Sequence, residues 1–288
     1  MCIRDRPSIM LVVMGPILNV PVTDLFAAAI MPGLMLAALY TGYTLIRCHL
    51  NPNLGPVVPE DLIPDSMKEV WIEFFKGLLP PVLLVGSSLG SILAGWATAT
   101  EGAAMGAVGA IFLTLAYRKL TFESFKSSLL KTLEITTLIM VLVCASNFFG
   151  AVFSRLGTPT MITEYLMLLD LPPTAILLII MAFIFLLAWP LEWVPIVLII
   201  IPIVLPLIEQ LGFNLTWFGI LVAVNLQTAW LSPPVALSAY FLKGVVPEWD
   251  LADIYKGMMQ FMAIQVVGLT LIIIFPQIVL WLPTYLYG

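Results

Sequence analysis

A proline pair inside an apolar stretch constrains the fold of this chain more than any other feature. Residues 213–246 are almost wholly apolar, with Lys243 as their first basic residue and no acidic residue among them. Ser232, Pro233 and Pro234 interrupt this stretch. Two consecutive prolines remove two backbone donors, and each keeps the residue before it out of the α conformation. We therefore predict a membrane helix over residues 213–246 that is broken near the middle of the bilayer.

The scarcity of charge places the whole chain in lipid. Of its 288 residues, 61% are hydrophobic and 10% are charged, whereas a soluble domain carries about 25% charged residues. From Leu156 to Leu242 there is no lysine or arginine. A chain that crosses lipid repeatedly must satisfy its backbone within helices or a closed barrel, and these apolar runs have helical length. The predicted fold class is an all-α polytopic membrane protein.

Few residues in this sequence suit metal, redox or nucleic-acid chemistry. The cysteines Cys2, Cys48 and Cys144 form no spaced pair, and His49 is the single histidine. We therefore predict no disulfide framework, no metal site, no cofactor and no His-based catalysis. There is no basic patch or aromatic platform, so nucleic acid is not an expected partner.

The order of polar and apolar segments divides the chain into four parts. Residues 1–6 are charged and irregular, and we expect them to lie outside the fold of a chain that starts partway through a larger protein. Residues 7–50 hold a short apolar segment and one full span. Residues 51–77 combine a proline-rich linker with an amphipathic helix that lies in the interface. Residues 78–288 hold the remaining membrane segments, ending with an uncharged span over 258–282.

A second interruption lies at residues 95–102, which read Gly-Trp-Ala-Thr-Ala-Thr-Glu-Gly. The apolar arms on either side are each about 15–17 residues, roughly 25 Å as a helix. Because each arm is marginal as a full span, we predict a re-entrant hairpin over residues 78–117. Its tip would hold two threonines and a carboxylate.

Oxygen-bearing side chains gather at both interruptions. Unwound backbone in transporters frees carbonyl groups that coordinate Na⁺, and hydroxyl and amide oxygens can complete such a site. The alternative is that the hydroxyls only re-satisfy the backbone groups that the prolines free. The residues concerned are Thr98, Thr100, Asn225 and Ser232.

Two carboxylates are expected at membrane depth, where a charged group costs at least ~2.5–3.5 kcal/mol. Glu101 follows the threonines of the hairpin tip, so it either caps a helix start or takes a direct part in ion binding. Glu192 lies between Trp189 and Trp193, and for this residue a structural role is the stronger interpretation.

The segment Gly86-Ser87-Ser88-Leu89-Gly90 fits the nucleophile pattern G-x-S-x-G. That pattern requires a strand–turn–helix context and a histidine base, whereas here it lies in a membrane helix far from His49. Small residues in membrane helices usually indicate close packing. An intramembrane serine hydrolase that uses Ser88 is kept as an alternative, but the chain is not expected to be an enzyme.

Several stretches together resemble the large membrane (M) subunit of tripartite ATP-independent periplasmic (TRAP) transporters, in the ion-transporter superfamily. Residues 95–104 resemble the family's G-x-x-T-P-T-E-A-A-A hairpin signature, and residues 225–236 resemble its N-x-x-x-x-x-L-T-P-P-x-G break. Residues 7–10 and 32–34 are similar to the proline break and P-G-L segment that close the first repeat, and residues 275–283 fit the family's ending.

This resemblance implies two inverted repeats, each with a hairpin and a broken helix. Residues 7–50 would be the end of the first repeat and residues 78–288 the complete second repeat, so that the first hairpin is missing. It also implies a Na⁺-driven importer of small organic anions in the bacterial inner membrane. A periplasmic binding protein delivers the substrate, a small four-helix membrane subunit supports the large one, and the transport domain moves as an elevator. A non-transporting truncated fragment is the other alternative.

On this basis we assign the predicted site residue by residue. The expected Na⁺ ligands are Gly95, Ala97, Thr98, Thr100 and Ser232, and the expected substrate-lining residues are Asn225, Gln227, Thr228, Pro233 and Pro234. The helix starts beside Glu101 and after Pro234 would face an anionic group of the substrate. The chain departs from the family's motifs at four positions, which are Ala99 for proline, Gly102 for alanine, Ser232 for threonine and Ala236 for glycine.

Overall fold

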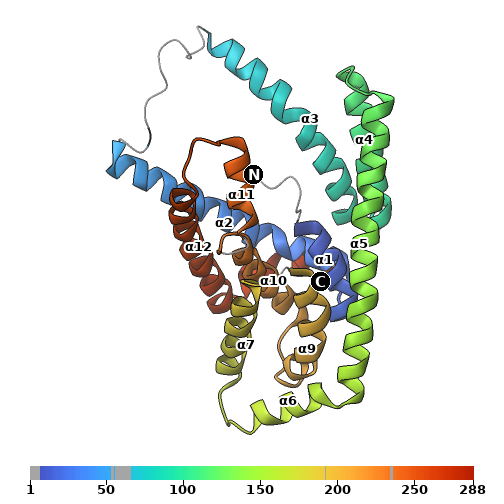
Figure 1. The fold of residues 1–288 in the computed structure, drawn as a ribbon, viewed down its shortest axis with the longest axis vertical. Coiled ribbons are helices and arrows are strands. Elements are labelled where there is room, and N and C mark those ends of the chain that lie inside the picture. Colours follow the sequence, from blue (N-terminus) through green and yellow to red (C-terminus); the bar gives the residue numbers. More distant parts are fainter. Residues whose placement is uncertain (1–6, 53–54, 56–65, 192, 234–235) are drawn as a thin grey trace. The chain divides into compact units, whose positions relative to one another are not determined.

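The structure is a computed structural model of the chain and describes residues 7–52, 55, 66–191, 193–233 and 236–288. Every regular element in these ranges is a helix (Figure 1), so the all-α class is confirmed. Within the same ranges, six helices have the length and the apolar composition needed to cross a membrane. The chain forms two units: residues 7–41 with Leu138–Gly288 make the first, and Gly42–Thr137 make the second.

The first unit contains most of the helices. The helices that belong to it in whole or in part are α1 (Pro7–Leu18), α2 (Val22–Leu50), α5 (Phe122–Arg155), α6 (Thr158–Met167), α7 (Pro173–Ala188), α8 (Trp193–Pro195), η3 (Ile196–Ile200), α9 (Ile201–Gln210), α10 (Leu215–Leu226), η4 (Gln227–Trp230), α11 (Leu237–Val245), α12 (Leu251–Ile274) and α13 (Gln277–Tyr287). The second unit holds the end of α2, the start of α5, and the helices α3 (Met67–Leu93) and α4 (Ala99–Ala116).

Helix α10 is the core element of the first unit. It contacts α1, α7, α12 and α13, and every residue from Trp217 to Leu226 is buried. A Cβ atom on Gly219 would lie 2.8 Å from Leu18 Cδ1, so this glycine is what lets α1 approach so closely. The Trp217 indole donates to the carbonyl oxygen of Ile272 at 3.1 Å, which ties α10 to α12. The segment that precedes the predicted break is therefore held by packing on several sides.

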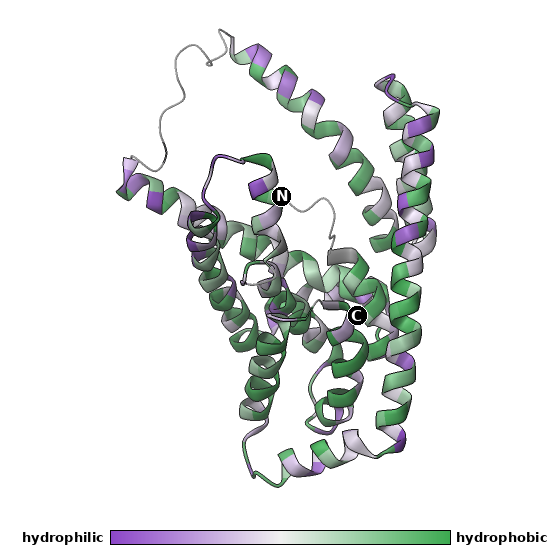
Figure 2. Cartoon of the chain, viewed as in Figure 1, coloured by the Kyte–Doolittle hydropathy of each residue, from purple (hydrophilic) through white to green (hydrophobic). Residues whose placement is uncertain are grey.

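Helices α3 and α4 of the second unit pack against each other as a helical hairpin. Both are long and apolar enough to cross a membrane, so the arms are not marginal as spans, and the re-entrant course over residues 78–117 stays a prediction. The amphipathic segment before it is not separate, because α3 runs from Met67 through Pro80 and Pro81 without a break. Proline at position 80 removes the N–H that would bond the Lys76 carbonyl. The Tyr117 hydroxyl donates to that carbonyl oxygen at 3.1 Å instead. The first turns of α3 mix hydrophilic and hydrophobic residues, and the rest is mostly hydrophobic (Figure 2).

The two arms of the hairpin approach closely near the tip. Ser88 Oγ donates to the carbonyl oxygen of Gly102 at 2.6 Å. A Cβ atom on Gly102 would lie 2.6 Å from Ile92 Cδ1, and one on Gly106 would lie 3.2 Å from Ser88 Oγ. Within the G-x-S-x-G segment, Ser88 therefore serves the packing of the two arms, whereas a Cβ atom on Gly86 or Gly90 would meet nothing within 4 Å.

The expectation of one final span over residues 258–282 is wrong. Helix α12 begins at Leu251 and ends at Ile274, and a separate helix α13 starts at Gln277. Pro276 lacks an N–H and cannot continue the hydrogen-bond ladder of α12. The Phe275 N–H still bonds the Leu271 carbonyl at 2.8 Å, so α12 closes its last turn before the chain turns into α13.

Candidate functional site

The broken helix is present and begins earlier than its prolines. After Leu226 the chain tightens into the 3₁₀ turn η4 at Gln227–Trp230 and resumes as a helix only at Leu237. The N–H groups of Leu231 and Ser232 both donate to the carbonyl oxygen of Thr228, at 3.1 and 3.0 Å. The change in backbone geometry at Gln227 precedes Pro233 and therefore needs a cause other than proline.

Three polar side chains of this break are completely buried. Asn225, Thr228 and Ser232 each have 0% exposure. Thr228 Oγ1 donates to the Asn225 carbonyl oxygen at 2.6 Å, and Ser232 Oγ donates to the Ala229 carbonyl oxygen at 3.4 Å. Both hydroxyls thus bond the backbone of the break, as the alternative interpretation of these residues predicts.

The side chain of Asn225 has a different character. Its Nδ2 donates to the carbonyl oxygen of Met181 on α7 at 2.8 Å. Its Oδ1 is buried and has no hydrogen-bond partner among the described residues. A buried acceptor left without a donor costs about 1–3 kcal/mol. That oxygen is therefore suited to bind a cation or a water molecule that enters the break.

The other residues predicted for this end of the site are less enclosed. Gln227 and Pro233 are half-buried. Gln227 Oε1 accepts a hydrogen bond from Gln265 Nε2 at 2.8 Å. Pro234 and Glu192 lie outside the described residues.

The tip of the hairpin is organised by hydrogen bonds of its own. Gly95 has a φ of 72°, a conformation that favours glycine, and ends the turn after α3. The N–H groups of Trp96 and Ala97 donate to the Ser91 carbonyl oxygen at 2.9 and 3.2 Å. These bonds fold the chain back before α4 begins.

Thr98 and Glu101 form a capping box at the start of α4. Glu101 Oε2 accepts from the Thr98 N–H at 2.8 Å and from the Thr98 hydroxyl at 2.9 Å. In return Thr98 Oγ1 accepts from the Glu101 N–H at 3.3 Å. The structure thus gives Glu101 the capping role, and direct ion binding by this carboxylate stays a prediction. Thr100, in the first turn of α4, is exposed.

The structure therefore contains two local clusters of predicted site residues. Asn225, Gln227, Thr228 and Ser232 come together around the break in the first unit, and residues 95–101 come together at the hairpin tip in the second unit. A single site formed by both clusters remains a prediction.

Two residues that sequence reasoning missed contact the break. Gln265 on α12 is buried, and its Nε2 donates to the Val224 carbonyl oxygen at 3.1 Å as well as to Gln227. The Tyr40 hydroxyl on α2 donates to Gln265 Oε1. The signal in the sequence was an amide inside the uncharged part of α12, but its partners are distant in sequence and could not be inferred from it.

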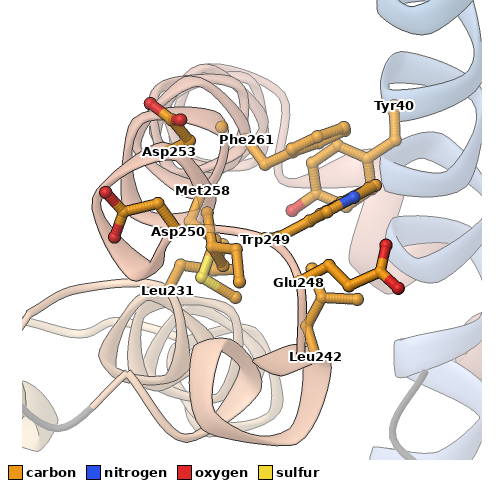
Figure 3. A pocket seen from close by; sticks show the side chains of 11 residues that line it. Tyr40, Leu231, Leu242, Glu248, Trp249, Asp250, Asp253, Met258 and Phe261 are labelled. Carbon is orange, nitrogen blue, oxygen red and sulfur yellow. The ribbon is translucent and has the colours of Figure 1, made fainter. Parts of the chain in front are cut away.

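A cavity of about 950 Å³ in the first unit reaches the break. Figure 3 shows the rings of Tyr40, Trp249 and Phe261 gathered on one side, and Leu231, the residue before Ser232, also lines the cavity. The carboxylates of Asp250 and Asp253 point away from these rings in the same view. The inside is therefore largely apolar, and charge lies at the rim.

A helical protein with several membrane-crossing segments and a break that buries polar groups has the architecture of a secondary transporter. A family model described as "Tripartite ATP-independent periplasmic transporter, DctM component" matches residues 7–278. The chain therefore belongs to this family, as its motifs predicted.

Curated relatives agree with this assignment. The chain is 28% identical over 287 residues to the sialic acid TRAP transporter large permease protein SiaM of Vibrio cholerae, covering 98% of this chain and 64% of the relative. It is 28% identical over 283 residues to the C4-dicarboxylate TRAP transporter large permease protein DctM of Pseudomonas aeruginosa, covering 97% of this chain and 64% of the relative. It is 25% identical over 283 residues to the sialic acid TRAP transporter permease protein SiaT of Haemophilus influenzae, covering 97% of this chain and 44% of the relative. The chain thus spans less than two thirds of the length of these relatives.

Family membership also decides between the classes of protein considered from the sequence. The relatives are permease subunits of transporters, so the chain is not an enzyme. The hydroxyl of Ser88 is used within the hairpin, where it bonds the Gly102 carbonyl. With its membrane-crossing helices, the chain is a multi-pass protein of the bacterial inner membrane.

Proposed function

We propose that this chain is part of the permease subunit of a Na⁺-coupled, binding-protein-dependent secondary transporter that imports a small organic anion of carboxylate type. The observation that carries this proposal is the Asn225 Oδ1 atom, which is buried at the helix break and has no hydrogen-bond partner among the residues that the structure describes. A membrane protein that keeps an unsatisfied acceptor in its core needs a reason for it, and a bound cation supplies one.

The ligands available to Na⁺ at the break are oxygen atoms. Asn225 Oδ1 provides one, and the Thr228 and Ser232 hydroxyl oxygens keep acceptor capacity because each hydroxyl only donates in the bonds described above. At the hairpin tip, Thr98 Oγ1 accepts one hydrogen bond and keeps a second lone pair. The carbonyl groups of Gly95 and Ala97 and the Thr100 hydroxyl would complete that end of the site.

The substrate would lie beside these ions, along Gln227, Thr228 and Pro233. The start of α4 presents backbone N–H groups and the positive end of a helix dipole, which favour an anionic group. The names of the relatives include sialic acid, C4-dicarboxylate and 2,3-diketo-L-gulonate transporters, and these support an organic acid as the substrate. The proposed partners are a small four-helix membrane subunit and a periplasmic binding protein, and the proposed movement is that of an elevator.

The test is uptake by the full-length transporter, reconstituted in vesicles with its small subunit and its binding protein. Radiolabelled sialic acid and C4-dicarboxylates serve as probes. We expect uptake of at least one of them to follow an inward Na⁺ gradient and to stop when K⁺ replaces Na⁺. The double variant Thr98→Ala and Thr100→Ala should lose most of this uptake, whereas Thr270→Val should keep it, because the Thr270 hydroxyl bonds only the carbonyl of Val266 in its own helix.

Two results would contradict the proposal. The first is uptake that a K⁺ gradient drives as well as a Na⁺ gradient, because sodium coupling would then be absent. The second is sodium-dependent uptake that is unchanged in the double threonine variant, because the hairpin tip would then not be an ion site.

A further inference from the structure

A buried glutamine on α12 holds the helix break from outside the predicted site. Gln265 has 1% exposure. Its Nε2 donates to the Val224 carbonyl oxygen at 3.1 Å and to Gln227 Oε1 at 2.8 Å. Its Oε1 accepts the hydroxyl of Tyr40. Both the NH₂ group and the carbonyl oxygen of this amide therefore form hydrogen bonds, although Gln265 lies within a membrane helix.

The contact with Val224 explains why the backbone changes before the prolines. Where an α-helix tightens into a 3₁₀ turn, carbonyl groups in the last α turn lose their usual backbone donors. This change occurs at Gln227, and Gln265 supplies a donor to Val224, in the turn just before it. Gln265 thus adds a hydrogen bond from α12 to the turn in which the backbone changes.

The two residues that Gln265 bonds stand on either side of Asn225 in the chain. Val224 is held through its carbonyl and Gln227 through its side chain. Asn225 itself is anchored to Met181 on α7, and its Oδ1 has no partner within the described parts of the chain. The position of that oxygen is therefore fixed between α7 on one side and α12 on the other.

Tyr40 fixes Gln265 in turn. Its ring packs edge-to-face on Phe261, with ring centroids 5.5 Å apart and an interplanar angle of 71°. Phe261 lies one helical turn before Gln265 on α12, so one aromatic contact and one hydrogen bond orient the same side chain. A buried amide with every group paired has a single favourable arrangement, because any other leaves a polar group unsatisfied.

We propose that Gln265 is a positioning residue for the ion site at the break, and that Tyr40 acts through it. The proposal rests on the proposed function, since it assigns Gln265 the task of placing Asn225 Oδ1 for sodium. Neither residue binds the ion itself. Loss of Gln265 should release the 3₁₀ turn and weaken sodium binding without removing any ligand.

The experiment uses the purified chain in detergent and the variant Gln265→Met, which keeps the side-chain size and removes all three hydrogen bonds. The first readout is hydrogen exchange of the backbone amides in residues 224–232. The second is the NaCl concentration that gives half of the sodium-dependent thermal stabilisation, with KCl keeping the ionic strength constant. We expect amide exchange about tenfold faster and a half-saturating NaCl concentration about tenfold higher. This is the size of effect expected from losing the two of these three hydrogen bonds that Gln265 donates to the break.

Three comparisons separate positioning from a general structural role. Gln277→Leu is the matched control, because Gln277 is exposed at the start of α13 and its amide should not matter to the break. Tyr40→Phe should give a smaller effect of the same kind. The double variant Tyr40→Phe with Gln265→Met should give the same exchange rate and the same half-saturating NaCl concentration as Gln265→Met alone. Tyr40 is proposed to act only by orienting Gln265, so loss of its hydroxyl should have no further effect once Gln265 is replaced.

A purely structural role predicts a different pattern. In that case Gln265→Met lowers the unfolding temperature equally with and without sodium, the half-saturating NaCl concentration stays at the wild-type value, and the proposal is overturned. It is also overturned if exchange in residues 224–232 matches that of Gln277→Leu. If NaCl does not stabilise the wild-type chain at all, the sodium proposal fails, and the exchange comparison still decides whether Gln265 holds the break.

Discussion

Replacing Asn225 with leucine should separate two effects of this side chain, namely its effect on the free energy of unfolding without sodium and its part in binding sodium. The variant loses the hydrogen bond to the Met181 carbonyl, 2.8 Å long, which contributes about 1 kcal/mol. It also removes the buried Oδ1, which has no partner in the described ranges and whose burial costs about 1–3 kcal/mol. Leucine has the same branching and the same number of side-chain heavy atoms, so no cavity forms. In sodium-free buffer the free energy of unfolding should therefore stay at the wild-type value or rise by up to about 2 kcal/mol.

Thermal unfolding of the purified chain, followed by tryptophan fluorescence, measures this change. For a chain of this size, 1 kcal/mol corresponds to a shift in Tm of about 2–4 °C. Sodium should raise the Tm of the wild type and leave Asn225→Leu unchanged. A site filled at 100 times its Kd would add about 2.7 kcal/mol to the wild type alone.

A matched control makes the same chemical change at another asparagine. Asn214 Oδ1 accepts from the Trp217 N–H at 3.1 Å and caps α10. Asn214→Leu should therefore lower the free energy of unfolding by about 1 kcal/mol and keep the response to sodium. The reasoning is refuted if Asn225→Leu destabilises the sodium-free chain more than Asn214→Leu does, or if it still responds to sodium.

Three further substitutions test local contacts within each of the two units. Glu101→Ala opens the capping box of α4 and should speed amide hydrogen exchange in the first turn of that helix, whereas Glu101→Gln should do so less because it keeps an acceptor. Ser88→Ala removes a 2.6 Å hydrogen bond between the hairpin arms and should lower the free energy of unfolding by about 0.6–1 kcal/mol, measured by thermal unfolding. Gly219→Ala places a Cβ atom 2.8 Å from a leucine side chain of α1 and should cost about 1–3 kcal/mol, whereas Gly33→Ala, where a Cβ atom meets nothing within 4 Å, should stabilise the chain.

The break could be predicted from the sequence because it follows from covalent structure. Pro233 and Pro234 each lack the N–H that a continuous helix would use at their positions, so an interruption could be expected there. The point at which the helix departs from α geometry could not be predicted, because the 3₁₀ turn at Gln227 depends on hydrogen bonds from Gln265, some 40 residues away in the chain. A local pattern carries no information about such a partner.

The hairpin shows the same division between local and distant causes. Its turn at Gly95 and its capping box at Thr98 and Glu101 are local features. The sequence predicted the turn, and it gave capping as one of two alternatives for Glu101. The continuation of α3 through Pro80 was missed, since the freed carbonyl of Lys76 is satisfied by Tyr117 from the end of the opposite arm. A proline in the sequence is therefore not enough to predict a helix end.

A proline also lies behind the error at the end of the chain. Residues 258–282 are uncharged, and hydropathy alone gives no reason to divide them. Helix α12 ends within these residues, just before Pro276, because proline has no N–H group with which to continue the hydrogen bonds of the helix. Apolar composition therefore predicts membrane location better than it predicts helix ends.

The central claim is that the helix break takes part in binding sodium. Equilibrium binding of radioactive sodium to the purified chain tests it most directly. We predict saturable binding that excess NaCl displaces and excess KCl does not, and that Asn225→Leu abolishes while Asn214→Leu retains it. Binding at the wild-type level in folded Asn225→Leu, or no saturable binding in the wild-type chain, would contradict the claim.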